Sequence, residues 1–309
     1  MRVTSRAPVR IDFAGGWTDV NIFARGAGGV VVNAAINHYV TGTLEVLDES
    51  EHGGPHLSHT AGVGKEGIGV SYQSELPSGS GLGTSSALNV VWLSLVKSQI
   101  ATDEDRARIA ELAYQLEEML GILGGKQDQY ASAFGGFNAM TFGETVEVER
   151  LTVPEEMVAE LENRLVLCYT GKPRLSGSIH ENVWGAFRRG VPETVNALYS
   201  LRDCALRMRE ALLNSDIGAV ADILSENWQN QKALDASVTN VQIEDLFAEA
   251  YATGAIGGKA CGAGGGGCLL FCCAEGTHLQ VSDALALAGA RVIPFQFDFT
   301  GLQVQSDAA

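Results

Sequence analysis

The hydrophobic and polar positions change their period along the chain, and the changes predict strands first and helices afterwards. Polar and apolar residues alternate from Arg2 to Phe13, which predicts a half-buried strand, and residues 30–32 and 39–46 predict further strands. Apolar residues without that alternation predict a buried helix at about 85–99 and a second helix from Thr102 or Asp103 to about 120. The first half is therefore expected to be a β-rich sheet followed by helices.

The second half alternates between helix and strand patterns. Strands are expected at 164–169, 268–273 and 291–297, and helices at 192–213, 216–235, 241–253 and about 278–288. This alternation predicts an α+β sandwich. Residues 147–154 resemble a connector, so we place the domains at residues 1–153 and 154–309. The Gly- and His-rich residues 49–69 are expected to form a solvated loop, and residues from Asp307 onward a disordered tail.

Composition restricts the class of protein. The chain has 309 residues, of which 46% are hydrophobic and 19% charged, as in a packed globular protein of one large or two ordinary domains. A net charge of −16 argues against a nucleic-acid surface. No apolar run approaches the roughly 20 residues of a membrane helix. There is no signal-peptide pattern, and the six cysteines are scattered, so we expect free thiols in a cytoplasmic protein.

The stretch PSGSGLGTSSA at 77–87 has the order of residues that is typical of a phosphate-binding loop. Glycines alternate with small residues, hydroxyl residues follow, and an apolar helix begins without a break. Glycines allow a ligand to approach the backbone, and a helix start offers free N–H groups and partial positive charge. Together they predict an anion site, most often for phosphate. The residues of this loop are Pro77, Gly79, Ser80, Gly81, Leu82, Gly83, Thr84, Ser85 and Ser86.

The alternative for this stretch is a flexible Gly/Ser linker, although a linker need not run directly into an apolar helix. The loop is not a Walker A sequence, because no Gly-Lys-Ser/Thr ends it, and it does not fit GxGxxG. The residues alone therefore indicate phosphate and nothing finer. Its hydroxyls could also ligate magnesium.

A second glycine-rich segment, Gly121–Met140, contains residues suited to proton transfer. Lys126 and Asp128 lie between two Gly-Gly pairs, where a cation and a carboxylate could act together. Glu117 lies near the end of a predicted helix, where its charge opposes the helix dipole and a magnesium ion would compensate it. The structural alternatives are a helix N-cap for Asp128 and an ordinary exposed glutamate for Glu117.

Two further clusters have candidate binding residues. Lys172, Arg174 and Ser176 precede a predicted helix, and they could contact a phosphate or equally form a solvated helix start. The glycine-rich run 257–267 precedes an apolar strand, and such a loop lets two backbones approach each other.

Three of these segments resemble the motifs of the GHMP kinases, the family of galactokinase, homoserine kinase and mevalonate kinase. PSGSGLGTSSA is similar to their second motif, RAPVRIDFAGGWTD at 6–19 resembles the first, and the loop at 259–267 resembles the third. The motifs occur in the family's order, and the resemblance covers nearly the whole chain. It implies a GHMP kinase fold, with an N-terminal ribosomal-protein-S5-like β/α domain and a C-terminal ferredoxin-like α/β sandwich.

The resemblance also implies roles for residues in the transfer of a phosphoryl group from ATP to a sugar. The loop would hold the ATP phosphates, Ser85 and Glu117 would hold Mg²⁺ with Ser86 as a fallback ligand, and Asp128 would take or orient the hydroxyl proton. Arg10 and Lys126 would stabilise the γ-phosphate. Residues implied in substrate binding are Asp19, Gly16, Trp17, Thr18, Lys172, Arg174, Gly264 and Gly265. For Asp19 the structural alternative is a turn-capping aspartate.

The identity of the sugar stays open between two branches of the family. GGKQDQYA at 124–131 and the segment 169–176 resemble the kinases of D-glycero-D-manno-heptose 7-phosphate, which implies transfer to the anomeric C1 hydroxyl. Gly16-Trp17 stands where galactokinases have Glu-His and resembles fucokinases as well, so fucose or another free sugar is the second candidate. A third candidate is a kinase-fold protein that senses a sugar and ATP without turnover. Nothing in the sequence indicates an oligomeric state.

Overall fold

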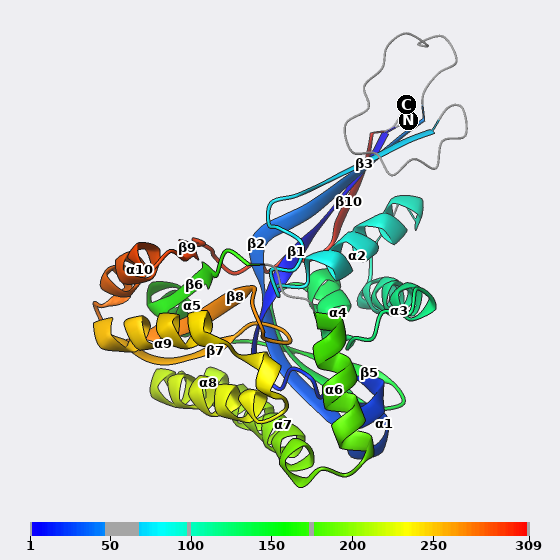
Figure 1. Ribbon diagram of the computed structural model, residues 1–309. Helices are drawn as coiled ribbons and strands as arrows, with labels where there is room; N and C mark the ends of the chain where they lie inside the picture. The colour runs from blue at the N-terminus through cyan, green and yellow to red at the C-terminus, as the bar shows by residue number, and fades with distance from the viewer. Residues whose placement is uncertain (1, 47–67, 98–99, 173–175, 308–309) are drawn as a thin grey trace.

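The computed structural model of the protein describes residues 2–46, 68–97, 100–172 and 176–307, and it is built on two antiparallel sheets (Figure 1). The first sheet has the order β10-β1-β2-β4-β5, with β3 pairing on β2, and the second has the order β7-β8-β6-β9. The strands of the first sheet are β1 (Arg2–Ala14), β2 (Gly29–Val46), β3 (Ile68–Ser74), β4 (Phe137–Phe142), β5 (Val146–Leu151) and β10 (Gln303–Asp307). Those of the second are β6 (Leu165–Tyr169), β7 (Ala255–Ala260), β8 (Cys268–Cys273) and β9 (Arg291–Val292).

Helices cover both faces of the first sheet. On one side α2 and α4 pack on β1 and β2 with α3 beside them, and from the other side α7 packs on both strands and α8 on β1 (Figure 1). The helices are α1 (Asn21–Ala27), α2 (Thr84–Lys97), α3 (Asp103–Met119), α4 (Gln127–Phe134), α5 (Glu155–Arg164), α6 (Ser176–Arg188), α7 (Pro192–Leu213), α8 (Ile217–Lys232), α9 (Val241–Thr253) and α10 (His278–Leu287), with a 3₁₀ turn η2 (Ala236–Val238). Because of this double cover, β1 alternates between buried and less buried residues only up to Arg6, and every residue from Ala7 to Ala14 is buried.

The predicted α+β class is confirmed, and the predicted helices lie close to their observed bounds. Helix α3 begins where its sequence signal indicates, because the Thr102 side chain accepts from the Asp105 N–H while the Asp105 side chain accepts from the Thr102 N–H. Helix α8 likewise begins after Asp216, whose side chain accepts from the Ala219 N–H.

Several strands differ from the predictions. The two strands expected at 30–32 and 39–46 are one continuous strand, β2, and the expected connector at 147–154 contains β5. The strand expected at 291–297 is only Arg291–Val292. Of the loop expected at 49–69, residues 49–67 lie outside the described residues, and residues 68 and 69 begin β3.

The end of the described chain is not a tail, because Asp307 is the last residue of β10 and pairs with Arg2 of β1. The last strand thus returns to the first sheet (Figure 1). A division at residue 153 separates β5 from α5, but the two sheets do not correspond to two continuous halves of the chain.

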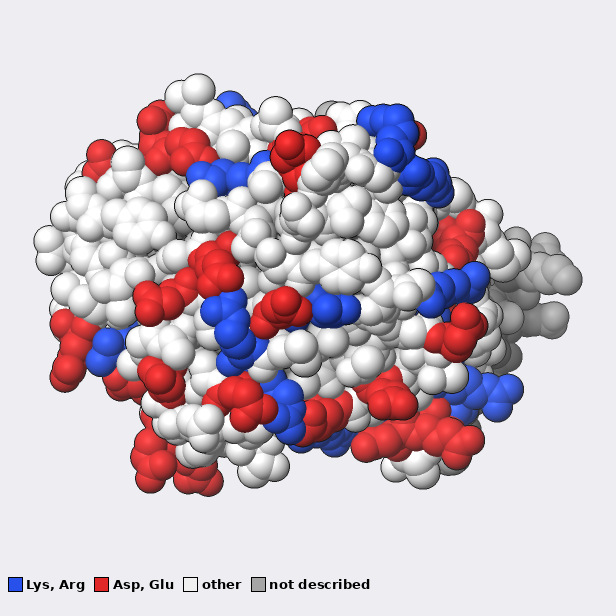
Figure 2. Space-filling model, turned by 90° about the horizontal axis from the view of Figure 1, so that it is seen from below, with Lys and Arg blue, Asp and Glu red and all other residues white. Residues whose placement is uncertain are grey.

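Charged groups on the surface are mixed in sign. Figure 2, which views the molecule from the lower side of Figure 1, shows acidic and basic side chains intermingled with uncharged areas and no broad basic patch on that face. Pairs such as Arg207–Glu226 at 2.6 Å are half-exposed, and ion pairs of this kind contribute little to stability. All six cysteines are buried, and none of them is in a disulfide. None of the helices in the described part of the chain is long and apolar enough to span a bilayer.

Candidate active site

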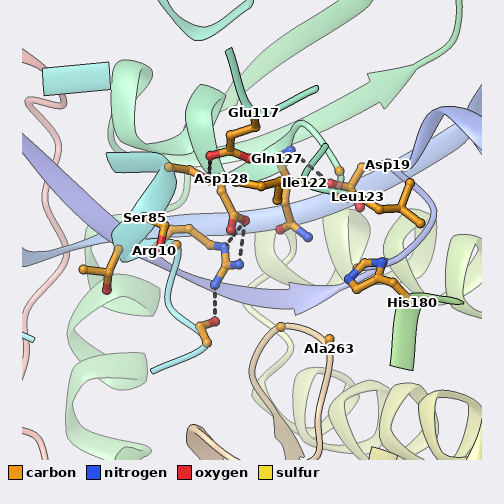
Figure 3. A pocket seen from close by; sticks show the side chains of 18 of the residues that line it. Arg10, Asp19, Ser85, Glu117, Ile122, Leu123, Gln127, Asp128, His180 and Ala263 are labelled. Carbon is orange, nitrogen blue, oxygen red and sulfur yellow. Dashed lines mark hydrogen bonds and ion pairs between the residues drawn. The ribbon is translucent and has the colours of Figure 1, made fainter. Parts of the chain in front are cut away.

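A cavity of about 430 Å³ opens where the end of β1, the loop before α2, the α3–α4 connection and the loop between β7 and β8 meet (Figure 3). These four segments carry the three glycine-rich motifs and the predicted acids. The predicted residues that line the cavity are Arg10, Gly16, Trp17, Asp19, Gly79, Ser80, Gly81, Gly83, Thr84, Ser85, Ser86, Glu117 and Asp128. Residues distant in sequence therefore converge on one space.

The phosphate loop has a backbone that requires its glycines. Gly79, Gly81 and Gly83 have φ angles of 76°, 83° and 78°, a region that side-chain-bearing residues rarely adopt. Leu82 between them is fully buried in the core, and its carbonyl accepts from the Arg10 N–H at 3.0 Å. The loop is thus anchored to β1 by an apolar side chain while its glycines and the N-terminus of α2 face the cavity.

The third glycine-rich loop lies directly against the phosphate loop. The Cys268 N–H donates to the Ser80 carbonyl at 2.7 Å, and a Cβ added to Gly267 would lie 2.6 Å from the same oxygen. Gly267 also has a φ of 79°. The close approach of two backbones that the sequence predicted is therefore observed, and it needs glycine at this position.

Arg10 and Asp128 form an ion pair beneath the phosphate loop, in which Arg10 is buried and Asp128 is partly buried. Arg10 is 1% exposed, and its Nε and Nη2 donate to Asp128 Oδ1 at 2.8 and 2.5 Å while its Nη1 donates to the Gly81 carbonyl at 2.7 Å. Burial by itself lowers the pKa of Arg10, but Asp128 and Asp12 outweigh it and the net shift is upward. Both bonds reach Oδ1, so Asp128 Oδ2 keeps no hydrogen-bond partner among the described residues, and it lies 3.3 Å from where a Gly83 Cβ would stand.

Glu117 is held by three neutral donors. Its Oε1 accepts from Ser86 Oγ and Asn89 Nδ2, and its Oε2 accepts from Gln129 Nε2, each at 2.9 Å. Burial raises its pKa, and the hydrogen bond from Ser86 opposes that rise. The carboxylate therefore lies at 6% exposure without a cationic partner among the described side chains. Ser86 is its hydroxyl neighbour, whereas the predicted ligand Ser85 is exposed and lines the cavity.

Asp19 connects the first motif to the start of α4. Its Oδ2 accepts from the Gln127 N–H at 3.0 Å, and its buried Oδ1 has no hydrogen-bond partner in the described structure. Burial is the main cause that raises the pKa of Asp19 to about 6, and the Gln127 N–H partly opposes it. An acceptor with an unused lone pair at a cavity wall suits a ligand hydroxyl.

Buried contacts from the second half of the chain hold the motifs in place. The Lys259 ammonium of β7 is fully buried and forms an ion pair with the Asp12 carboxylate of β1, whose Oδ1 accepts from the Gly262 N–H at 3.1 Å. From α8, Asn227 Oδ1 accepts from the Gly15 N–H at 3.0 Å, and Gln231 Nε2 donates to the Gly262 carbonyl at 2.7 Å. No local pattern of residues indicates these positioning contacts.

Some predicted site residues do not reach the cavity. Lys126 lies at 9% exposure, but its Nζ bonds both carboxylate oxygens of Glu111 at 3.0 Å and lies over the Tyr114 ring, so the structure does not place it at a γ-phosphate. The Thr18 hydroxyl is bonded to the carbonyls of Gly15 and Val30 and shapes the turn after β1.

The remaining predicted residues have structural contacts of their own. Pro77 is exposed and Leu82 is buried in the core, so neither lines the cavity. Gly264 and Gly265 pack against Val238, and it is Gly262 and Ala263 from the same loop that line the cavity. Lys172 is exposed, and its carbonyl accepts from the Gly267 N–H; Arg174 lies outside the described residues.

The structure adds lining residues that the sequence did not single out. Gln127 precedes Asp128 and could have been suspected from that position, whereas His180 of α6 belongs to no recognisable pattern (Figure 3). Leu120, Ile122 and Leu123 provide an apolar and partly exposed rim. Among the described residues, no group of three His, Cys, Asp or Glu side chains could hold a metal ion by itself.

Comparison with known proteins identifies the family. Residues 38–136 match the GHMP kinases N-terminal domain, and residues 208–290 match the GHMP kinases C-terminal domain. The chain is 31% identical to the D-glycero-alpha-D-manno-heptose 7-phosphate kinase of Campylobacter jejuni, over 97% of this chain and 98% of that protein. It is 27% identical to the bifunctional fucokinase/GDP-fucose pyrophosphorylase of Arabidopsis thaliana, over 86% of this chain but 29% of that protein.

Solved structures agree with the sequence comparison. The crystal structure of a D-glycero-D-manno-heptose 1-phosphate kinase from Bacteroides thetaiotaomicron superposes with a TM-score of 0.77 at 28% identity, covering 99% of this chain and all of that one. The resemblance that the three motifs indicated, and the fold it implied, are thereby confirmed. The chain belongs to the GHMP kinase family and is an enzyme of the phosphotransferase class.

Proposed function

We propose that this kinase transfers the γ-phosphoryl group of ATP to the anomeric C1 hydroxyl of D-glycero-D-manno-heptose 7-phosphate. The observation that carries the proposal is the position of Asp128, whose Oδ2 lies 3.3 Å from the Cβ site of Gly83 in the phosphate loop. A hydroxyl bonded to that oxygen would lie beside a phosphate bound on the loop. Such positioning, with charge stabilisation, supplies most of the catalysis of phosphoryl transfer.

Different residues of the site would bind the phosphates, stabilise the transferred group and accept the proton. The backbone N–H groups of residues 79–86 and the N-terminus of α2 would bind the β- and γ-phosphates. Arg10 would stabilise the charge on the transferred group and hold Asp128 through Oδ1. Asp128 would orient the sugar hydroxyl through Oδ2 and accept its proton as the new O–P bond forms and the bond from the γ-phosphorus to the β–γ bridging oxygen breaks, with ADP as the leaving group.

The residues present fit a magnesium ion next to the phosphates. Glu117 is a buried carboxylate with only neutral hydrogen-bond partners and a raised pKa, so a cation would relieve the cost of its charge. Its oxygens and the Ser86 hydroxyl are ligands of the type that Mg²⁺ prefers. We assign the ion to Glu117 and Ser86, with Ser85 close by in the same helical turn. When bound, it would neutralise charge on the phosphates.

The choice of sugar depends on the relatives and on one wall of the cavity. Both heptose kinases cover almost the entire chain, whereas the fucokinase relative supports a free sugar as the second candidate. Asp19 would accept a hydrogen bond from a sugar hydroxyl through Oδ1, which has no partner in the described structure. Lys172, whose carbonyl accepts from the Gly267 N–H of the third glycine loop, is our candidate for the sugar phosphate, together with Arg174 from the sequence resemblance.

The test is ATP consumption with a panel of free and phosphorylated aldoses, including D-glycero-D-manno-heptose 7-phosphate, L-fucose and D-mannose. Asp128→Asn should lower turnover by roughly 10² to 10⁴, the range for removal of a general base. Glu117→Gln should lower turnover and weaken the Mg²⁺ dependence. Its neighbour Glu118→Gln is the matched control, because Glu118 bonds Tyr114 and does not line the cavity.

Two results would separate the alternatives. A folded Asp128→Asn protein with near-normal turnover would remove the catalytic role of Asp128. ATP and sugar binding without turnover by the unmodified protein would instead support the sensor. Lys172→Ala should raise KM for a phosphorylated sugar and leave KM for a free sugar unchanged.

A further inference from the structure

Three helices meet at the Glu117 carboxylate. Ser86 and Asn89 of α2 donate to its Oε1, and Gln129 of α4 donates to its Oε2, each at 2.9 Å. Glu117 itself belongs to α3 and lines the cavity. An ionised carboxylate can only accept, so the atom that Gln129 presents to it is the amide nitrogen. Donors from two neighbouring helices therefore restrict the orientation of the acid to which we assign the magnesium ion.

Gln129 differs from the other two donors because it is remote from any ligand. Ser86 and Asn89 line the cavity, whereas Gln129 is fully buried and does not. Its Nε2 bonds Glu117, and its Oε1 has no hydrogen-bond partner in the described structure. Any influence of the Gln129 side chain on a bound ligand must therefore pass through the Glu117 carboxylate or through the packing of α4.

An amide at this buried position has a cost that an apolar side chain of similar size would avoid. Leaving the buried Oε1 of Gln129 unpaired disfavours folding. What the amide provides in exchange is the bond from Nε2 to the Glu117 carboxylate, and hydrogen bonds to an ionised group are stronger than neutral ones. The contribution of Gln129 that an apolar residue could not make is therefore its hold on Glu117.

The first turn of α4 serves both acids of the site. Asp128 directs its Oδ2 to within 3.3 Å of the Cβ site of Gly83, and the next residue, Gln129, reaches Glu117 of α3. Successive side chains of a helix point about 100° apart, so one turn can face the phosphate loop and α3 at the same time. Figure 3 shows Asp128 and Glu117 together at the cavity.

We propose that Gln129 is a positioning residue of the magnesium site, which holds the Glu117 carboxylate in one orientation at the cavity wall before the ion binds. With Gln129 in place, the carboxylate is fixed at Oε2 as well as at Oε1. Without it, only the donors of α2 remain and the carboxylate can rotate, so that ordering it lowers the affinity for the ion. This inference rests on the proposed function, and it adds a residue that controls metal affinity without contacting the metal.

The test compares the affinity for AMP-PNP, a non-hydrolysable ATP analogue, in excess Mg²⁺ and in EDTA. The ratio of the two affinities is called the Mg²⁺ gain. Gln129→Met nearly keeps the length of the side chain and removes the donor, so it should lower the Mg²⁺ gain by about 10-fold, as is typical for loss of the partner of a metal-ligating carboxylate. Its affinity for AMP-PNP in EDTA should equal that of the wild type.

Turnover gives a second readout. The Mg²⁺ concentration for half-maximal rate should rise in Gln129→Met by a factor similar to the loss of the Mg²⁺ gain, and saturating Mg²⁺ should restore most of kcat. In a Glu117→Gln background, Gln129→Met should have no further effect on the Mg²⁺ gain, because the carboxylate through which it acts is gone.

Asn138→Leu is the matched control for packing. Asn138 of β4 is likewise a fully buried amide whose oxygen has no partner in the described part of the chain. Its Nδ2 donates to the carbonyls of Gly135 and Gly136. This variant should lose stability and keep the wild-type Mg²⁺ gain. If Gln129→Met does not fold, Gln129→Asn, which withdraws the donor by one methylene, replaces it and should lower the Mg²⁺ gain as well.

Failure of this inference can be distinguished from failure of the proposed function. If Glu117→Gln loses the Mg²⁺ gain while Gln129→Met keeps it, or if Gln129→Met and Asn138→Leu lose it equally, the positioning role is wrong and the assignment of Mg²⁺ to Glu117 stands. If Glu117→Gln keeps the wild-type gain, that assignment fails and the inference fails with it. Neither outcome depends on the identity of the sugar, because the binding measurement requires no turnover.

Discussion

Replacing Asp19 by asparagine should stabilise the protein and impair its activity. Burial is the main cause that raises the pKa of this carboxyl from 3.8 to about 6, so the folded protein disfavours its ionised form. Each pKa unit corresponds to 1.36 kcal/mol, and a shift of about 2 units makes ionised Asp19 cost about 3 kcal/mol of folding free energy at pH 7. Asparagine removes the charge and can still accept the Gln127 N–H.

The direction of the pKa shift determines how the stability of the wild type changes with pH. A carboxyl with a raised pKa binds its proton more tightly in the folded protein than in the unfolded chain, so the free energy of unfolding falls as pH rises from about 4 to about 6. Asp19→Asn should therefore be more stable than the wild type by about 3 kcal/mol at pH 7, and equal to it below pH about 4. Urea unfolding of both proteins between pH 4 and pH 8 measures the difference.

Activity should move in the opposite direction. The variant loses an anionic acceptor for a sugar hydroxyl, and we expect kcat/KM for the sugar to fall by about 100-fold. Asp245→Asn, an exposed change on α9, is the control and should follow the wild type at every pH. A stability difference that is absent at pH 7, or that does not change with pH, would refute the burial argument.

Two other perturbations test how the second sheet holds the site. Lys259→Met leaves the Asp12 carboxylate buried without its cation and should destabilise the protein by about 3–5 kcal/mol, and adding Asp12→Leu should recover much of that loss in thermal unfolding. Gly267→Ala should weaken both ATP binding and stability, because the new Cβ would lie 2.6 Å from the Ser80 carbonyl oxygen. Gly276→Ala is the control, because Gly276 has a similar φ of 77° but no atom within 4 Å of the Cβ position. The control should lose only about 1 kcal/mol of stability and bind ATP as the wild type does. Equal ATP affinities in the two alanine variants would contradict the contact argument.

Local chemistry made much of the fold predictable. Helix α3 was predicted from a capping box and a periodic apolar stripe, and both signals depend only on residues close together in the sequence. The sequence predicted two strands where β2 is one, because the middle of β2 is less apolar. Asn33 in that middle part is nevertheless fully buried between β1 and β4. Strand β10 has a polar sequence and forms because the edge of β1 offers it hydrogen-bond partners. Pairing with distant strands, which local pattern does not contain, decided both.

The candidate site shows the same division. The glycine loop was identified from sequence because alternating positive φ angles require glycine, and Asp128 because it lies in a recognisable motif. The family resemblance implied a role for Lys126 at the γ-phosphate, whereas in the structure its ammonium is paired with Glu111 of α3. His180 was not found, because its place beside Trp17 results from packing α6 against the turn that follows β1.

By itself the sequence determined which segments can bind phosphate and which acids could act there, because backbone freedom, helix starts and side-chain chemistry are properties of neighbouring residues. Only the tertiary structure decided which of those groups share a cavity and which are instead paired in ion pairs and turns. It also decided which side chains outside the recognised motifs line the cavity. The burial and the direction of a side chain depend on contacts between segments far apart in sequence, such as Asp12 with Gly262 at a separation of 250 residues, and no local pattern specifies such contacts.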